Sequence, residues 1–268
     1  MKTVFLLAIL LTTSALAAAQ PGHASQPRRA IICLTYDDGL PSHLRTVLPQ
    51  LDSAGLKATF FLNAIQGAST AVGEASPAVA GWTAAALRGH ELANHTLFHA
   101  CPEKLGWPKA LAVESYTEER MLAEISTQNA LLALLDPRRK TRSFAFPCNN
   151  FLLGATDYAG LIRQRGLVRY GRAGGTRASV VTDFWGLDPM KVPSWMVEEG
   201  TSVQELVAFA ERVRQAGGLG IYQFHGVGAE FFRVSASTHR AFLAYLKAHP
   251  DAYWVTTFSE AMDFVTRK

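Results

Sequence analysis

Short runs rich in β-branched and aromatic residues recur along almost the whole chain, and each predicts a buried strand. Between them lie longer segments whose apolar residues recur at helical spacing. The predicted strands are 30–35, 57–62, 90–93, 142–146, 167–170, 180–185, 219–224 and 253–256. This alternation of strands and helices predicts a mostly parallel sheet with crossover helices.

Several of the helical segments begin with a residue that can cap a helix. These starts are Ser42 before 43–54, Ser115-x-x-Glu118 before a segment reaching Leu135, Ser202-x-x-Glu205 before a segment reaching Gln215, and Thr257-x-x-Glu260 before the last segment. About eight strand–helix units in about 240 residues close more economically into a barrel than into an open sheet. We therefore predict an α/β fold, a single TIM-like (β/α) barrel, and we find no linker or internal repeat that would divide it.

The composition excludes several classes of protein. A chain of 268 residues with 49% apolar residues can bury a full core, and its 21 glycines, 12 prolines and 3 cysteines fit neither disorder nor a collagen or disulfide scaffold. The formal charge of +4 is mild, and its one basic block, 138–140, is interpreted as a solvated helix end. We therefore expect no nucleic-acid partner, and we expect a monomer.

The N-terminus has the pattern of a secretory signal. Lys2, the apolar run 4–11 and a small-residue A-x-A ending predict cleavage after Ala17 or Ala19, with an uncleaved anchor as the alternative. We divide the chain into a signal peptide (1–19), a flexible lead-in (20–29) and one folded domain (30–268). No later apolar stretch approaches membrane length. We therefore expect a secreted or periplasmic protein without a membrane span after signal cleavage.

Disulfides persist outside the cytoplasm, and the cysteines allow one bridge. Cys33 lies in an apolar run, which predicts a buried thiol. Cys101 and Cys148 lie in loop-like sequence and are the candidate pair, although spacing alone does not prove the bridge.

Chemically reactive residues follow several predicted strands, at the ends where parallel barrels carry their active sites. Asp37 and Asp38 end the first strand and can take different roles, one as a cation ligand and the other as a base; an isolated Asp-Asp-Gly is more often a turn. His95 and His99, four residues apart, make with one carboxylate a three-ligand metal site open to water, or else a hydrogen-bonded pair. His225 ends a strand before glycines and suits a general acid, or else a satisfied core histidine.

The order of T-Y-D-D-G (35–39), H-T-L-F-H (95–99), F-A-F-P-C (144–148) and a strand ending in F-H-G (224–226) resembles the polysaccharide deacetylases of carbohydrate esterase family 4. That family includes deacetylases of chitooligosaccharides, peptidoglycan and acetylxylan. The resemblance covers about residues 30 to 262. It implies a distorted (β/α) barrel over 30–268 that removes acetyl groups from sugars with one divalent metal, zinc before cobalt or nickel.

The resemblance implies a role for each reactive residue. Asp38, His95 and His99 would hold the metal, which would polarise the acetyl carbonyl and acidify a water. Asp37 would be the base that takes the proton of the attacking water. His225 would be the acid that protonates the leaving sugar nitrogen or oxygen.

Further positions follow from the same resemblance. The backbone N–H of Cys148, after Pro147, would donate to the tetrahedral oxyanion, and Tyr36 is assigned to substrate binding. Asp188 would polarise the acid histidine, with Asp183 as the alternative. If the second and third motifs converge on one metal, Cys101 and Cys148 come together, and a disulfide there would join two active-site loops; two free thiols or a cysteine ligand are the alternatives.

The third motif departs from the family pattern. The family commonly has an arginine there that orients the base, whereas this chain has Ala145 and Phe146. Arg169 and Arg172, near the end of the next predicted strand, are the candidates to replace it.

We therefore predict a metal-dependent hydrolase acting on an acetylated carbohydrate, N- or O-acetylated. A barrel glycosidase using Asp37 and a second carboxylate explains neither the histidine pair nor His225. A non-catalytic carbohydrate-binding descendant, which the missing arginine favours, has no need for both a base and an acid. The loops 64–82 and 101–116 would set specificity. The candidate sugar-stacking platforms, which could equally be packing residues, are Trp82, Trp107, Trp185 and Trp195.

Overall fold

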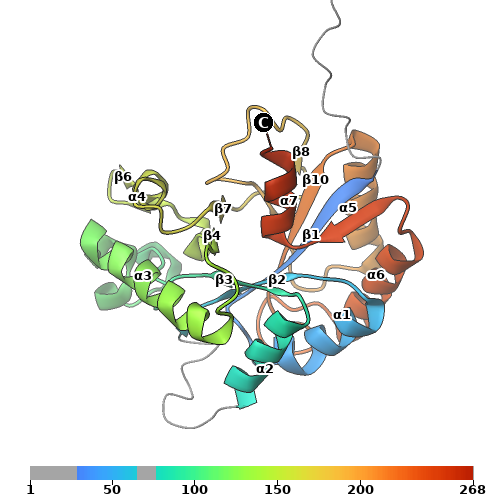
Figure 1. Ribbon diagram of the computed structural model, residues 1–268, viewed down its shortest axis with the longest axis horizontal. Helices are drawn as coiled ribbons and strands as arrows, with labels where there is room; N and C mark the ends of the chain where they lie inside the picture. The colour runs from blue at the N-terminus through green and yellow to red at the C-terminus, as the bar shows by residue number, and fades with distance from the viewer. Residues whose placement is uncertain (1–28, 65–76, 268) are drawn as a thin grey trace, which may run out of the picture.

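The computed structural model describes residues 29–64 and 77–267, and a curled, mostly parallel sheet forms its centre (Figure 1). The strand order is β7-β4-β3-β2-β1-β10-β8, with β11 paired to β1 and β9 paired to β10. The strands are β1 (Ala30–Asp37), β2 (Thr59–Leu62), β3 (Glu91–Asn94), β4 (Ser143–Ala145), β7 (Tyr170–Arg172), β8 (Val180–Val181), β9 (Trp195–Met196), β10 (Leu219–Phe224) and β11 (Tyr253–Thr256). A separate antiparallel hairpin comprises β5 (Leu152–Leu153) and β6 (Thr156–Asp157).

The predicted α/β barrel is confirmed in a half-closed form. Within the described residues, β7 pairs with neither β8 nor β9, and one isolated bridge, Arg172 to Val192, lies beyond β7. β8 runs antiparallel to β10, whereas the other pairs of the central sheet are parallel. The sheet therefore curls around an interior without closing into a full ring.

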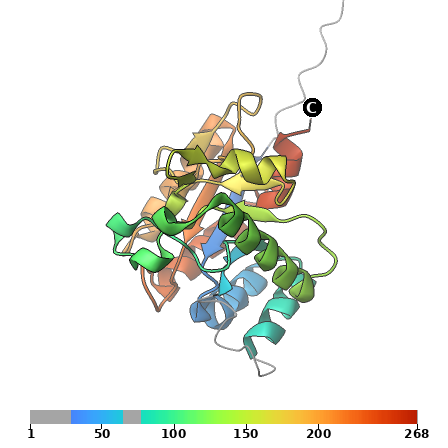
Figure 2. The same ribbon diagram turned by 90° about the vertical axis from the view of Figure 1, so that its left-hand side faces the viewer.

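Most helices cover the outside of the sheet (Figures 1 and 2), whereas α7 packs against the other face, with Ile31 and Cys33 of β1. On the outside, α3 packs behind β3, where Asn94 Nδ2 donates to Ile125 O at 2.9 Å. The helices are α1 (Leu48–Ala54) after a π-helical turn (His43–Val47), α2 (Pro77–Leu87), α3 (Glu118–Leu135), α4 (Tyr158–Gln164), α5 (Val203–Ala216), α6 (Ala236–Ala248) and α7 (Phe258–Val265). Short 3₁₀ turns span Glu103–Leu105, Lys109–Leu111, Val113–Ser115 and Pro147–Asn149. In the described part of the chain, no helix combines the length and apolar character needed to cross a membrane.

Two of the predicted helix caps are correct. Ser202 and Glu205 form a complete capping box at α5, and the Thr257 side chain accepts from the Glu260 N–H at α7. The cap of α3 is Thr117 and not Ser115, because Ser115 belongs to a preceding 3₁₀ turn. Ser42 precedes a helical segment as predicted, but its hydroxyl does not cap that segment.

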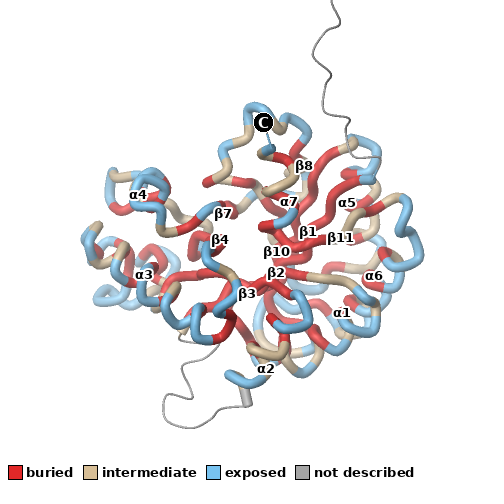
Figure 3. The backbone as a smooth tube through the Cα atoms, in the orientation of Figure 1, coloured by how far each residue is buried: buried red, intermediate tan, exposed pale blue. Residues whose placement is uncertain are grey.

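Alternation along β1 decides which residues line the interior. Ile31 and Cys33 lie in one apolar cluster with α7, whereas Ile32 and Leu34 lie in another with the outer helices. Side chains two residues apart in a strand share a face. The buried backbone is concentrated in these central strands (Figure 3). Cys33 is a buried free thiol, as predicted.

The predicted signal peptide (1–19) and all but the end of the lead-in (20–29) lie outside the described residues, as does most of the predicted specificity loop 64–82.

Candidate active site

Asp37 lies at the end of β1 and faces the interior of the half-barrel. Its Oδ2 accepts from Arg172 Nη2 at 2.6 Å and from Gln223 Nε2 at 3.0 Å, and the whole carboxylate is buried. Among the residues that the structure describes, its Oδ1 has no hydrogen-bond partner. Burial acts to raise the pKa of Asp37, but the Arg172 guanidinium and nearby imidazoles hold this pKa below its usual value. The carboxylate is therefore ionised at neutral pH, with one oxygen available to accept a proton.

Arg172 supplies the arginine that the third motif lacks. It is fully buried on β7, and its Nη1 donates to Ser194 Oγ at 3.3 Å. Ser194 Oγ lies 3.2 Å from Gln223 Oε1, so Arg172, Ser194 and Gln223 form a closed ring of polar contacts on Asp37. The alternative, Arg169, pairs instead with Asp263 near the surface.

Asp38 and the two motif histidines converge as predicted. Asp38 Oδ1 lies 3.7 Å from His95 Nε2 and 3.3 Å from His99 Nε2. The three groups place ligand atoms within 4.8 Å of one another. Asn63 Nδ2 donates to Asp38 Oδ1 at 2.9 Å, which orients the carboxylate.

The protonation of these residues fits a divalent metal. His95 Nδ1 donates to Ala145 O at 2.8 Å, so in the neutral ring the Nε2 lone pair faces Asp38. Burial lowers the pKa of His95 to about 3 and that of His99 to about 4, so both rings are neutral at neutral pH. Burial raises the pKa of Asp38 to about 6. Two neutral imidazoles beside one carboxylate are a donor set that suits zinc.

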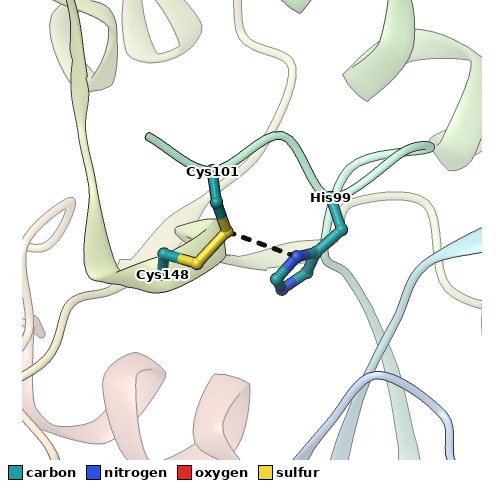
Figure 4. Close-up of side chains that lie close together, drawn as sticks. All are labelled: His99, Cys101 and Cys148. Atoms are coloured by element: carbon teal, nitrogen blue, oxygen red, sulfur yellow. Dashed lines mark hydrogen bonds between the residues drawn. A yellow bond between two sulfur atoms is a disulfide. The ribbon is translucent and has the colours of Figure 1, made fainter. Parts of the chain in front are cut away.

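The predicted disulfide is confirmed. Cys101 and Cys148 are bridged, with Cα atoms 5.7 Å apart, and Cys101 Sγ lies 3.5 Å from His99 Nδ1 (Figure 4). The bridge joins the loop that carries His99 to the turn that follows β4. It thereby brings Pro147 and the Cys148 backbone beside the histidine cluster.

His225 follows β10 and completes the cluster. Its Nε2 lies 4.0 Å from Asp37 Oδ2, and His43 Nε2 donates to the His225 carbonyl at 2.9 Å. In the described part of the chain, its Nδ1 has no hydrogen-bond partner.

The predicted partner of His225 is incorrect. The half-exposed Asp188 carboxylate pairs with Arg163 and accepts from the Met190 N–H at 2.9 Å. The alternative, Asp183, accepts from the N–H groups of Trp185 and Gly186 in a local turn. Each aspartate is therefore held by other partners, and neither carboxylate reaches His225.

The assignment of Tyr36 to substrate binding is also incorrect. Tyr36 is fully buried in the outer apolar cluster, between the rings of Phe60 and Phe224. Its hydroxyl bonds His239 Nε2 at 2.7 Å. The reason is strand alternation, because Tyr36 precedes Asp37 and so points to the opposite face of β1.

Two of the predicted sugar platforms are core residues. Trp82 and Trp195 are buried, whereas Trp185 is 78% exposed. Trp107 is half-buried and its ring lies 5.4 Å from that of His99.

Backbone strain gathers around the same residues. A positive φ is uncommon outside glycine and costs energy, so such residues tend to mark functional sites. The described non-glycine residues with positive φ are Asp38, Thr96, His99, Cys148, Asn149, Glu230 and Phe232. At Asp38 the φ of 76° turns the chain, so that this residue and the adjacent Asp37 both reach the site.

Sequence reasoning missed Ser194 and Gln223. Gln223 carried a readable signal, since it is a polar residue in an apolar strand and lies two residues before His225, on the same face. Ser194 carried none, because it lies in a segment without clear periodicity.

The half-closed α/β barrel thus brings an Asp-Asp pair and three histidines to its strand ends, where Asp38, His95 and His99 are a set of groups that could hold a metal ion. The sequence profile described as Polysaccharide deacetylase matches residues 24–159, about half of the chain. The chain therefore belongs to the polysaccharide deacetylase family. Among curated proteins, no sequence matches the chain significantly.

Solved structures share the fold. A Mycobacterium smegmatis protein assigned as a polysaccharide deacetylase is 15% identical, with 93% of this chain and 94% of that chain covered and a TM-score of 0.63. The catalytic domain of a peptidoglycan N-acetylglucosamine deacetylase from Eubacterium rectale is 18% identical (89% and 94% covered, TM-score 0.55). A BA3943 mutant, described as a family pseudoenzyme with restored enzymatic activity, is 16% identical (88% and 69% covered, TM-score 0.54). At these identities the likeness concerns the fold alone.

Proposed function

We propose that the chain is a metal-dependent hydrolase that removes N- or O-acetyl groups from an acetylated polysaccharide. One observation carries the proposal: Asp37 Oδ2 lies 4.0 Å from both His95 Nε2 and His225 Nε2. The proposed base thus lies close both to the proposed metal ligands and to the proposed acid. Acyl hydrolysis by water needs these three groups within reach of one substrate.

Asp38, His95 and His99 would hold the metal, for which we propose zinc, with cobalt or nickel as alternatives. When bound, a divalent metal there would polarise the acetyl carbonyl and make a water a better nucleophile. Membership of the family and the neutral state of both imidazoles support this assignment.

Other residues would carry out the two proton transfers and stabilise the negative charge of the oxyanion. Asp37 accepts the proton of the attacking water at Oδ1, while Arg172 and Gln223 hold Oδ2. The backbone N–H of Cys148, which Pro147 precedes, donates to the developing oxyanion. His225 gives the proton from Nε2 to the leaving sugar atom, so acetate and a free amine or hydroxyl result.

Neither alternative is favoured. A glycosidase needs a second carboxylic acid opposite Asp37, whereas the groups around its Oδ2 are a guanidinium, an amide and two imidazoles. The non-catalytic alternative drew its support from the missing arginine, and the contact of Arg172 with Asp37 weakens that support.

We also propose that residues 1–19 are a signal peptide, that 20–29 are a flexible lead-in to a catalytic domain over 30–268, and that the protein acts as a monomer outside the cytoplasm. The Cys101–Cys148 bridge supports an oxidising compartment.

The test is acetate release from a panel of acetylated xylan, GlcNAc oligomers and acetylated peptidoglycan glycan. We expect release that a chelator abolishes and that zinc or cobalt restores. Asp37→Asn should eliminate turnover and keep the metal, whereas His95→Ala should lose the metal. No release from the whole panel by metal-replete protein would overturn the proposal in favour of a binding module.

A further inference from the structure

Two exposed phenylalanines lie against the acid histidine, and the chemistry above does not use them. Phe231 is 41% exposed and Phe232 is 47% exposed. Their ring centroids lie 5.9 Å and 5.4 Å from that of the buried His225 and 5.7 Å from each other. Large aromatic side chains lose favourable burial when they face water, so an exposed pair beside a reactive group suggests a ligand.

The loop that carries these rings is tightly built. The Gly226 N–H donates to Phe231 O, and the Gly226 carbonyl accepts from the Val234 N–H, both at 3.1 Å. A side chain at Gly226 would place its Cβ 2.1 Å from Ala229 O, so only glycine allows the loop to close this way. Backbone contacts within the loop therefore help to hold the two rings beside His225.

The loop also holds unfavourable backbone geometry. Glu230 and Phe232 have φ of 60° and 46°, in the left-handed region that non-glycine residues avoid. Arg45 Nη2 lies 3.7 Å from Glu230 Oε1, which ties the loop to the π-helical turn after β1. Strain of this kind persists where the surrounding structure imposes it, and here it presents Phe231 and Phe232 to solvent.

The position of the acid determines which part of the substrate meets these rings. In acyl hydrolysis the acid protonates the leaving atom, which here is the sugar nitrogen or oxygen. The sugar ring must therefore lie within hydrogen-bond reach of His225. Because both phenylalanine rings lie within 6 Å of the His225 ring, the sugar would contact them.

We propose that Phe231 and Phe232 form a stacking subsite for the pyranose ring that carries the acetyl group. The apolar C–H face of the pyranose packs on the exposed rings and holds the leaving atom at His225 Nε2. This subsite rests on the proposed function, since it assigns the place of the sugar in that reaction.

The test compares an acetylated sugar with an acetyl ester that has no ring. Phe231→Leu and Phe232→Leu keep apolar bulk but remove the stacking face. We expect KM for acetylated xylo-oligosaccharides or GlcNAc oligomers, whichever the wild type hydrolyses, to rise about 5- to 10-fold, as loss of one aromatic stacking contact predicts. The kcat/KM for triacetin should stay within about twofold, because an interaction with the sugar is absent from that reaction. Leu134→Ala, which removes an exposed apolar side chain on α3, is the control and should change neither value.

Binding separates this proposal from the proposed function. In an Asp37→Asn background, calorimetric titration with the same oligosaccharides should show weaker binding for both leucine variants. If the wild type releases no acetate but the leucine variants still bind the oligosaccharides more weakly, the subsite would be retained and the activity rejected. Unchanged KM and unchanged binding in folded variants, or an equal loss on triacetin, would overturn the subsite and leave the activity standing.

Discussion

Gln223 offers the sharpest test of how the proposed base, Asp37, is held. Its amide donates to Asp37 Oδ2 at 3.0 Å, beside the bond from Arg172, and both partners are buried. Gln223→Met keeps the length and apolar contacts of the side chain but removes this donor. The Arg172 charge remains in place, so the carboxylate does not become a buried unpaired ion.

The size of the effect follows from the bond that is lost. A hydrogen bond to a charged group contributes about 1.5–3 kcal/mol, and the amide bonds the ionised carboxylate and not the protonated one. Its loss favours protonation of Asp37 by about 10- to 100-fold, since about 1.4 kcal/mol is a factor of ten. We therefore expect the acid limb of the kcat/KM profile to move about 1 to 2 pH units upward, with the plateau at higher pH retained within a few-fold.

The assay is acetate release from the wild-type substrate between about pH 3 and 9, with metal content measured at each pH, because the pKa of Asp37 lies below its usual value. Gln128→Met is the matched control, because Gln128 is also a buried glutamine but donates to Leu62 O on the outer side of the sheet. It should lower stability without moving the acid limb. An acid limb that stays in place in metal-replete Gln223→Met would refute the reasoning, because Gln223 would then be a packing residue.

Two further predictions concern His239, which is buried beside Tyr36 in the outer cluster, and the Cys101–Cys148 bridge beside His99. Burial lowers the pKa of His239 to about 3, so between about pH 4 and 6 the unfolded chain binds a proton on this ring and the native state does not. The free energy of unfolding should therefore fall with falling pH. In urea titrations of His239→Gln, the dependence of this free energy on pH should be shallower by about 1.4 kcal/mol per pH unit. An unchanged slope would show that the native state accepts this proton. Reduction of the Cys101–Cys148 bridge should lower the free energy of unfolding by about 2–4 kcal/mol and weaken zinc binding, because the bridge anchors the loop that carries His99. Calorimetric zinc titration with and without a phosphine reductant measures the zinc affinity, and the double variant Cys101→Ala, Cys148→Ala is the control. Equal zinc affinity in the oxidised and reduced protein would contradict the prediction.

The central strands of the sheet were predicted best, whereas β7, which carries Arg172, was predicted at 167–170 and spans Tyr170–Arg172. β10 and β11 have the predicted bounds, and β1 extends the predicted strand to Asp37, because apolar β-branched runs specify strands buried on both faces. The edge of the half-barrel was predicted poorly. The run 180–185 forms a strand only over Val180–Val181, and β9 has two residues, which is too short for a periodic signal.

Tyr36 and Gln223 show which part of the site can be predicted from the sequence. One rule, that side chains two apart share a face, places Gln223 with His225 inside the half-barrel and sends Tyr36 outside with Phe224. Motif matching assigned Tyr36 because it adjoins Asp37, and it passed over Gln223 because no motif contains it. The strand rule was therefore the better guide to the side chains near the base.

Arg172 required more than that rule. It lies on the far strand of the sheet order, with β4, β3 and β2 between β7 and β1, and yet its guanidinium bonds Asp37. Only the curl of the sheet brings those two strand ends together across the interior, and curl depends on strand pairing that no local pattern encodes. A family arginine can thus disappear from its motif while its contact is made from a different strand, so the loss of a motif residue does not by itself argue for loss of the base.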